Sequence, residues 1–161
     1  MPDLLWVDDD GPGMFLFEVF QLEQQGWTVH FVTHIAAAAE ALAAKPYDAV
    51  LLDQMMPLGA GDDQPVDVWA GCLVVWWMRH RAPPPGAPAA SVEATHALWA
   101  ATPLPHNQGV PVVIVSAFDD PEVDAEIRKV SPTPRPVHIL VKPVEAEALL
   151  LQLKPTGDTP S

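Results

Sequence analysis

The amino-acid sequence predicts a doubly wound α/β fold built on a five-stranded parallel sheet. Four short runs rich in branched apolar residues do not alternate with polar residues, which is typical of parallel strands covered on both faces. These runs are residues 4–7, 49–52, 112–115 and 139–141. Residues 28–32 alternate polar and apolar, which predicts an edge strand. Helices are expected between and after the strands, at about 13–25, 35–45, 66–80, 120–130 and 144–153. This alternation predicts right-handed crossovers and the flavodoxin-like strand order 2-1-3-4-5.

The connection between the third and fourth strands is longer than a crossover requires. Between Pro57 and Pro111 lie 53 residues, whereas a crossover needs about a dozen. The proline-rich run at 83–88 reads as an extended linker, and Ser91 is expected to cap a short extra helix that ends near Ala101. We therefore expect one domain over residues 1–154, an insertion at about 82–109 after the third helix, and a flexible tail at 155–161.

The composition restricts the class of protein. A chain of 161 residues that is 49% hydrophobic fits one domain with a single sizeable core. Its formal net charge of −13 excludes a nucleic-acid-binding surface. The one cysteine, Cys72, cannot form an internal disulfide, which fits the cytoplasm. No signal peptide is expected at the N-terminus, and no apolar run reaches the roughly 18 residues of a membrane span.

Polar residues follow four of the expected strands at the point where each strand ends. A single polar residue there is usually a turn or a helix cap. The carboxyl ends of parallel strands, however, lie on one edge of the sheet, where open α/β folds place their ligand sites. Three acidic positions, a hydroxyl and an ammonium should therefore converge: Asp8, Asp9 and Asp10 after the first strand, Asp53 after the third, Ser116 after the fourth and Lys142 after the fifth.

This set of side chains indicates phosphoryl transfer. Carboxylates without a nearby histidine or cysteine prefer a hard cation such as Mg²⁺, which neutralises the oxygens of a transferring phosphoryl group. A carboxylate can act as the nucleophile and form an aspartyl-phosphate. A lysine supplies a point charge to a phosphoryl oxygen, and a serine hydroxyl supplies a hydrogen bond.

Four motifs together resemble the receiver domains of two-component response regulators: LWVDD (5–9), LLDQMMP (51–57), IVSA (114–117) and LVKP (140–143). The resemblance covers the chain except the insertion and the tail. It implies a stand-alone receiver that is phosphorylated on Asp53 by a histidine kinase or a phosphotransfer protein. Such a domain is not an enzyme in the usual sense, because it catalyses only its own magnesium-dependent phosphorylation and dephosphorylation.

The resemblance also implies a metal site. Asp9 would bind Mg²⁺ directly and Asp8 mainly through water, while Asp53 and the backbone carbonyl of Met55 would complete the site. Mn²⁺ would serve in place of Mg²⁺. Asp10 extends the acidic pair, and we expect it to cap the turn into the first helix and not to bind the metal.

The remaining roles implied by the resemblance concern the phosphoryl group. Ser116 would bind the phosphoryl group and report its presence, and Lys142 would pair with it. The bond between Lys142 and Pro143 is expected to be cis. The chain departs from the family three positions before the lysine, where Ile139 replaces the aromatic residue that usually swings inward on activation.

Two alternative functions remain open on the sequence. The run from Asp8 to Gly11 resembles the nucleophile loop of haloacid-dehalogenase-type phosphatases, in which Asp8 would be phosphorylated. Against this enzyme, Pro12 stands where that family has a threonine, and Asp53 would have no role. The other alternative is an interaction module that keeps the receiver fold but works without phosphorylation.

The expected third helix carries an apolar surface over much of its circumference, formed by Trp69, Leu73, Trp76 and Trp77. A helix of this kind is buried on more than one side. Either the helix of the insertion covers it, or it serves as a docking or homodimer surface. With no output domain attached, the signal is expected to pass to a downstream protein that the sequence does not name.

Overall fold

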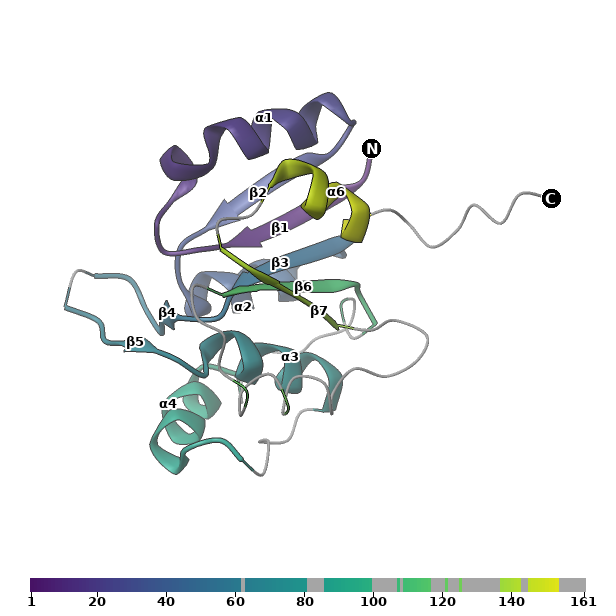
Figure 1. Ribbon diagram of the computed structural model, residues 1–161. Coiled ribbons are helices and arrows are strands. Elements are labelled where there is room, and N and C mark those ends of the chain that lie inside the picture. The colour runs from purple at the N-terminus through teal and green to yellow at the C-terminus, as the bar shows by residue number, and fades with distance from the viewer. Residues whose placement is uncertain are drawn as a thin grey trace.

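A five-stranded parallel sheet forms the centre of the computed structural model, with strand order β2-β1-β3-β6-β7 (Figure 1). Its strands are β1 (Asp3–Val7), β2 (Thr28–Val32), β3 (Ala49–Asp53), β6 (Val112–Ser116) and β7 (Val137–Val141). All neighbouring pairs are parallel. The fold class and the flavodoxin-like strand order predicted from the sequence are therefore confirmed. The structure describes residues 1–61, 63–80, 86–99, 107, 109–116, 121, 125, 137–142 and 145–153.

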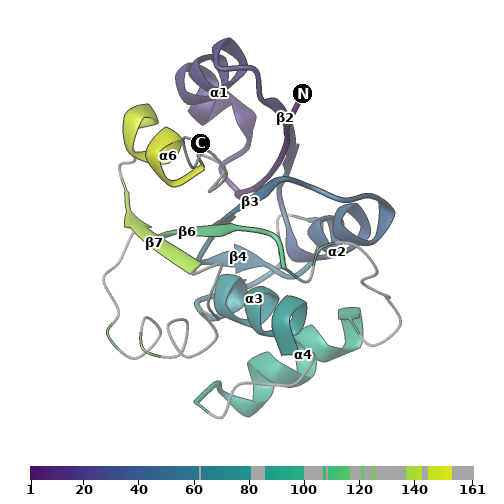
Figure 2. The ribbon, with the colours of Figure 1, turned by 90° about the vertical axis from the view of Figure 1, so that its right-hand side faces the viewer.

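Helices cover both faces of the sheet. They are α1 (Leu16–Gln24), α2 (Ile35–Ala44), α3 (Ala70–His80), α4 (Ala89–Trp99) and α6 (Ala146–Leu153), with the 3-10 turn η1 (Pro12–Phe15) before α1. Helices α1 and α6 lie on one face and α2 and α3 on the other, with α4 outside α3 (Figures 1 and 2). Of the helix expected at 120–130, only Pro121 and Ala125 are described, and both are helical.

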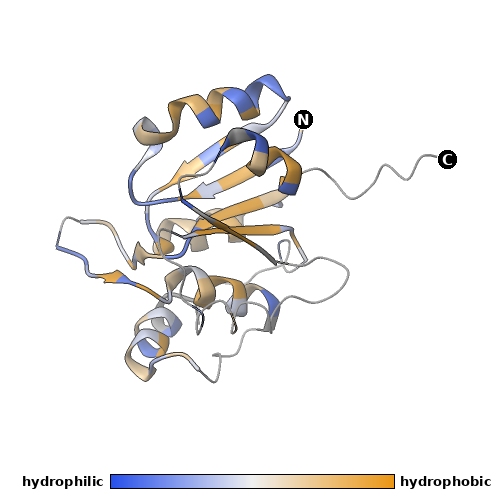
Figure 3. Ribbon diagram, in the orientation of Figure 1, coloured by the Kyte–Doolittle hydropathy of each residue, from blue (hydrophilic) through white to orange (hydrophobic). Residues whose placement is uncertain are grey.

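Alternate residues of each central strand enter two separate apolar cores. In β1, Leu5 and Val7 pack toward α2 and α3, whereas Leu4 and Trp6 pack toward α1 and α6. The central strands are therefore apolar at nearly every position (Figure 3), because neither face of the sheet meets water. Full burial of one such side chain contributes about 1.5 to 3 kcal/mol, so this double coverage is the main source of stability in the sheet.

The two outer strands are less buried than the central three. Every residue of β2 is only partly buried, as its alternating sequence predicts. Residues 139–141 of β7 form an apolar run that is typical of a covered strand, yet Ile139 and Leu140 are only partly buried, because β7 forms the other edge of the sheet.

The connection between β3 and α3 differs from the prediction. Helix α3 begins at Ala70 and not at residue 66. An antiparallel hairpin precedes it, in which β4 (Met56–Pro57) pairs with β5 (Val66–Asp67). The surplus length was predicted to follow α3, but part of it lies in this hairpin. The prediction was wrong here because each hairpin strand has two residues, too few to produce a strand pattern.

The insertion forms helix α4, which packs against α3 and α2. Ser91 does not cap this helix, because α4 begins at Ala89 and Ser91 lies in its first turn. The backbone carbonyl of Ser91 instead accepts a hydrogen bond of 2.6 Å from the Thr95 hydroxyl. Trp69 and Trp77 of the apolar surface are each only 8% exposed. Leu73 is 5% exposed and Trp76 is partly buried, so most of that surface is covered within the chain.

Some expectations are not tested by the described residues. The domain boundary at residue 154 stays a prediction, and the tail at 155–161 lies outside the described residues. Within the part of the chain that the structure describes, no helix combines the length and the apolar character needed to cross a bilayer.

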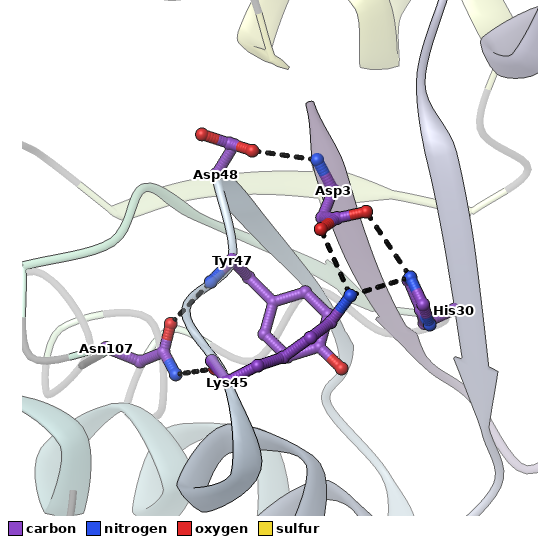
Figure 4. A network of polar contacts seen from close by, with 6 residues as sticks. All are labelled: Asp3, His30, Lys45, Tyr47, Asp48 and Asn107. Atoms are coloured by element: carbon purple, nitrogen blue, oxygen red, sulfur yellow. Dashed lines mark hydrogen bonds and ion pairs between the residues drawn. The ribbon is translucent and has the colours of Figure 1, made fainter. Parts of the chain in front are cut away.

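A buried asparagine fixes the point where the chain returns from the insertion (Figure 4). Asn107 is fully buried. Its Oδ1 accepts a hydrogen bond of 2.9 Å from the backbone N–H of Tyr47. Its Nδ2 donates to the carbonyls of Leu42 at 2.6 Å and Lys45 at 2.8 Å, which lie at the end of α2 and lack partners within the helix. One side chain thereby joins the end of α2, the start of β3 and the segment before β6.

Beside this contact, polar side chains connect the start of β1 with the middle of β2 (Figure 4). The Lys45 ammonium lies 3.0 Å from Asp3 Oδ2 and 2.9 Å from His30 Nε2. Its hydrogen bond to Asp3 lowers the pKa of that carboxyl. This cluster lies at the amino end of the sheet, opposite the edge to which the strand ends bring Asp8 and Asp53.

Replacing Asn107 by alanine should destabilise the chain by about 3 kcal/mol, because one buried and two partly buried backbone groups lose their partner. Chemical denaturation measures this loss, which corresponds to a fall in melting temperature of about 6 to 12 °C. Gln24→Ala, at the exposed end of α1, is the control and should have almost no effect. Equal stability of the two variants would show that Asn107 does not secure the insertion.

Candidate functional site

The carboxyl ends of the parallel strands bring four of the predicted site residues to one edge of the sheet. In register, Asp53 pairs with Val115 and Ser116 pairs with Val141. Lys142 follows directly after β7, and its backbone N–H donates a hydrogen bond of 2.8 Å to the carbonyl of Ser116. Ser116 is buried at the end of β6, the strand between those that carry Asp53 and Lys142.

The ammonium of Lys142 is shared by two buried carboxylates. Its Nζ donates to Asp53 Oδ2 at 2.9 Å and to Asp8 Oδ2 at 3.1 Å. It also lies 3.8 Å from Asp10 Oδ2 and 5.8 Å from the centre of the Phe15 ring. Because Asp8, Asp53 and Lys142 lie at the carboxyl ends of three different strands, these contacts join β1, β3 and β7 at the site.

Asp53 is the last residue of β3 and only 5% exposed. Its Oδ1 accepts a hydrogen bond of 3.1 Å from the backbone N–H of Met55. The pKa of Asp53 is raised to about 6. Burial is the main cause and the charge of Asp8 adds to it, while the hydrogen bond from Lys142 acts in the opposite direction. The carboxylate therefore sits in a site that is short of positive charge.

The three consecutive aspartates form the other half of the site. Asp8 is 1% exposed and its Oδ1 accepts a hydrogen bond of 3.0 Å from the backbone N–H of Asp10, whereas Asp9 and Asp10 are exposed. One carboxylate oxygen of each lies within 4.8 Å of the others. Partial desolvation and repulsion by Asp10 and Asp8 raise the pKa of Asp9. A cluster of oxygen ligands with this excess of negative charge fits a cation such as Mg²⁺.

Asp10 does not cap the first helix, as the sequence had suggested. The position before η1 is Gly11, with a φ of 79°, and no side chain caps that turn. Asp10 instead belongs to the acidic cluster, with its side chain 52% exposed. Pro143 lies outside the described residues, so the expected cis bond after Lys142 stays a prediction.

The overall structure is similar to those of known receiver domains. A CheY-like receiver domain protein from Methanospirillum hungatei JF-1 matches with a TM-score of 0.60 and 16% identity, over 96% of this chain and 91% of that one. Chemotaxis response regulator CheY4 of Vibrio cholerae matches with a TM-score of 0.59 and 20% identity, over 95% and 96% of the two chains. The chain has the receiver fold.

A third similar structure contains a phosphorylated aspartic acid. It is a response regulator from Burkholderia pseudomallei with a phosphorylated aspartic acid, a calcium ion and citrate. It matches with a TM-score of 0.56 and 13% identity, over 96% of this chain and 67% of that one. No protein-family model and no curated protein sequence matches the chain.

Gly71, which the sequence did not single out, lies directly against the end of β3. A Cβ atom on Gly71 would lie 2.7 Å from the carbonyl oxygen of Asp53 and 3.0 Å from Cα of Gln54. The Gly71 N–H donates a hydrogen bond of 3.0 Å to the carbonyl of Gln54. The first turn of α3 can therefore approach the end of β3 only with glycine here. The available signal was a glycine in an otherwise apolar helix, which usually has a packing reason.

Gly71→Ala should destabilise the chain by about 1 to 3 kcal/mol, because the added methyl group would overlap backbone atoms that cannot move aside easily. Gly13→Ala is the matched control, since a Cβ there meets nothing within 4 Å, and its effect should stay within about 0.5 kcal/mol. Urea denaturation of both variants checks the difference. Similar values for the two would contradict the close approach of α3 to Asp53.

Asp53→Asn should change how stability depends on pH in metal-free buffer. The pKa of Asp53 rises from its ordinary value of 3.8 in the unfolded chain to about 6 in the folded one. The stabilisation from its proton is therefore full below pH 3.8 and is lost as the pH rises through 6. The advantage of Asp53→Asn over the parent should grow across this window to about 3 kcal/mol at most. A stability difference that is constant from pH 4 to 7 would contradict the raised pKa.

Proposed function

We propose that the chain is a response-regulator receiver in which Asp53 accepts a phosphoryl group from a histidine kinase or a phosphotransfer protein. The proposal rests mainly on the buried Asp53 carboxylate at the end of the central strand, which lies 2.9 Å from the Lys142 ammonium. The receiver fold supports the proposal, as does the phosphorylated aspartic acid in the similar Burkholderia protein.

In this reaction a carboxylate oxygen of Asp53 attacks the phosphorus atom, and the bond from phosphorus to the donor nitrogen breaks. The carboxylate loses its own charge and gains a phosphoryl group with about two negative charges. Lys142 then pairs with a phosphoryl oxygen, as its present contact with Asp53 Oδ2 allows. The hydroxyl of Ser116 donates to a second phosphoryl oxygen and thereby registers the modification.

We assign the metal site to the same edge. The carboxylates of Asp8, Asp9 and Asp53 and the backbone carbonyl of Met55 would hold Mg²⁺ or Mn²⁺. The bound cation supplies positive charge to the transferring oxygens. Asp9 is exposed, so a cation can reach it from solvent, while the buried Asp8 is held in place by the backbone of Asp10 and by Lys142.

The output is proposed to be contact with another protein in the cytoplasm. The formal charge of −13 disfavours a nucleic-acid target. An apolar patch lies next to the site, on η1 and α1, where four large side chains are more than half exposed: Met14, Leu16, Phe17 and Phe20. Exposed patches of this kind are typical of surfaces that contact proteins.

Incubation with acetyl phosphate and Mg²⁺ should label Asp53, because acetyl phosphate replaces the kinase as the donor. Mass spectrometry of peptides identifies the labelled residue. Asp53→Asn should lose the label, whereas Asp63→Asn, an exposed aspartate of the β4–β5 hairpin, should keep it. Label on Asp8 would favour the haloacid-dehalogenase-type phosphatase, and no label at either aspartate would favour the module that works without phosphorylation.

Asp9→Ala should weaken Mg²⁺ binding by about tenfold or more, which corresponds to about 1.4 kcal/mol, because it removes the direct ligand. Asp10→Ala removes the same charge from the same loop and should weaken binding by less than about threefold. Titration with Mg²⁺, followed by the fluorescence of Trp6 at the end of β1, measures both. Equal losses in the two variants would show that Asp9 acts only through its charge.

A further inference from the structure

Gln54 connects the acceptor to three neighbouring elements. It lies between Asp53 and Met55. Its backbone N–H donates to the carbonyl of Val115 in β6 at 2.9 Å, and its carbonyl accepts from Gly71 of α3 at 3.0 Å. Its side-chain Nε2 donates to the carbonyl of Val68 at 3.0 Å, just after β5. The peptide groups beside the acceptor are thus held by the sheet, by α3 and by the hairpin.

The side chain of Gln54 is a polar group that is almost fully buried. The residue is 5% exposed, and its buried Oε1 has no hydrogen-bond partner among the residues that the structure describes. An apolar side chain of the same shape would fill this space without leaving a buried carbonyl unpaired. Within the described part of the chain, the bond from Nε2 to Val68 is therefore the one interaction of this side chain that an apolar residue could not make.

The hairpin on the other side of this bond projects from the body of the domain (Figure 1). Val66 and Val68 are nearly half exposed, so a displacement of β5 changes a surface that partners can reach. The base of the hairpin contacts both helices on that face of the sheet. The carbonyl of Leu58 accepts a hydrogen bond of 3.0 Å from Ala36 in α2, and Trp69 leads directly into α3.

We propose that Gln54 couples the chemical state of Asp53 to the β4–β5 hairpin, which makes the hairpin a reporter of phosphorylation. This inference rests on the proposed function of Asp53. A phosphoryl group on Asp53 removes the negative charge of its carboxylate and weakens the hydrogen bond that its Oδ1 accepts from Met55. The peptide between Gln54 and Met55 then shifts, and the buried amide of Gln54 transmits the shift to Val68.

Hydrogen exchange of the full chain tests this coupling. Beryllofluoride with Mg²⁺ serves as a stable mimic of the phosphoryl group on Asp53, and mass spectrometry follows exchange in the two arms of the hairpin, residues 55–61 and 63–69. Three proteins are compared: the parent, Gln54→Met, which keeps the shape of the side chain without its amide, and Gln64→Met, which makes the same change at an exposed position of the hairpin.

The parent and Gln64→Met should show at least a twofold change in the exchange rate of the hairpin arms when the mimic is added. Gln54→Met should lose this response while acetyl phosphate still labels its Asp53. A full response in Gln54→Met, or none in a parent whose Asp53 is labelled, overturns the inference. An unlabelled Asp53 in the parent overturns the proposed function itself, and the two failures are thereby distinguished. Hydrogen exchange of β1 and β3 without the mimic reports whether Gln54→Met remains folded.

Discussion

The structure of the site depends on one ammonium shared by two buried carboxylates. Asp8 and Asp53 are almost completely removed from water, and Lys142 Nζ lies within 3.1 Å of an oxygen of each. Burying a charge is costly unless it is paired. Lys142 pairs with both carboxylates from the end of β7, and this arrangement draws the ends of β1, β3 and β7 together. Burial, together with the charge of Asp8, raises the pKa of Asp53 to about 6, because one positive charge shared by two carboxylates does not offset these effects. The same shortage of positive charge suits the edge to a cation.

The sequence predicts this edge well because a parallel sheet places every strand's carboxyl end on one side. That rule alone predicts that four side chains lie at this edge: Asp8, Asp53, Ser116 and Lys142. Details that depend on where a helix begins were less predictable. Ser91 was expected to cap a helix that in fact starts two residues earlier, and Asp10 was expected to cap a turn that has no side-chain cap. Gly71 and Gln54 were missed because their roles depend on how closely α3 approaches β3, which no local pattern reports.

The β4–β5 hairpin and α4 both contact α3 or the segment leading into it. The hairpin β4–β5 precedes it and α4 covers it from outside (Figure 2), so that a helix apolar over much of its circumference is buried. Its first turn rests against the carbonyls of Asp53 and Gln54 through Gly71. A change at Asp53 therefore has a direct structural path into α3 and the hairpin. This path does not require the residue at 139, where isoleucine takes the place of the aromatic residue that the family resemblance implies.

The sharing of Lys142 is tested most directly by a double-mutant cycle on stability in metal-free buffer above pH 7, with Lys142→Met, Asp53→Asn and the double variant. Lys142→Met alone leaves two buried carboxylates unpaired and should cost about 3 to 5 kcal/mol. With Asp53→Asn present only Asp8 remains charged, so the same substitution should cost less by about 1 to 3 kcal/mol. A coupling energy of this size is expected if Asp8 and Asp53 share Lys142. Additive losses, with no coupling between the two positions, would contradict this sharing.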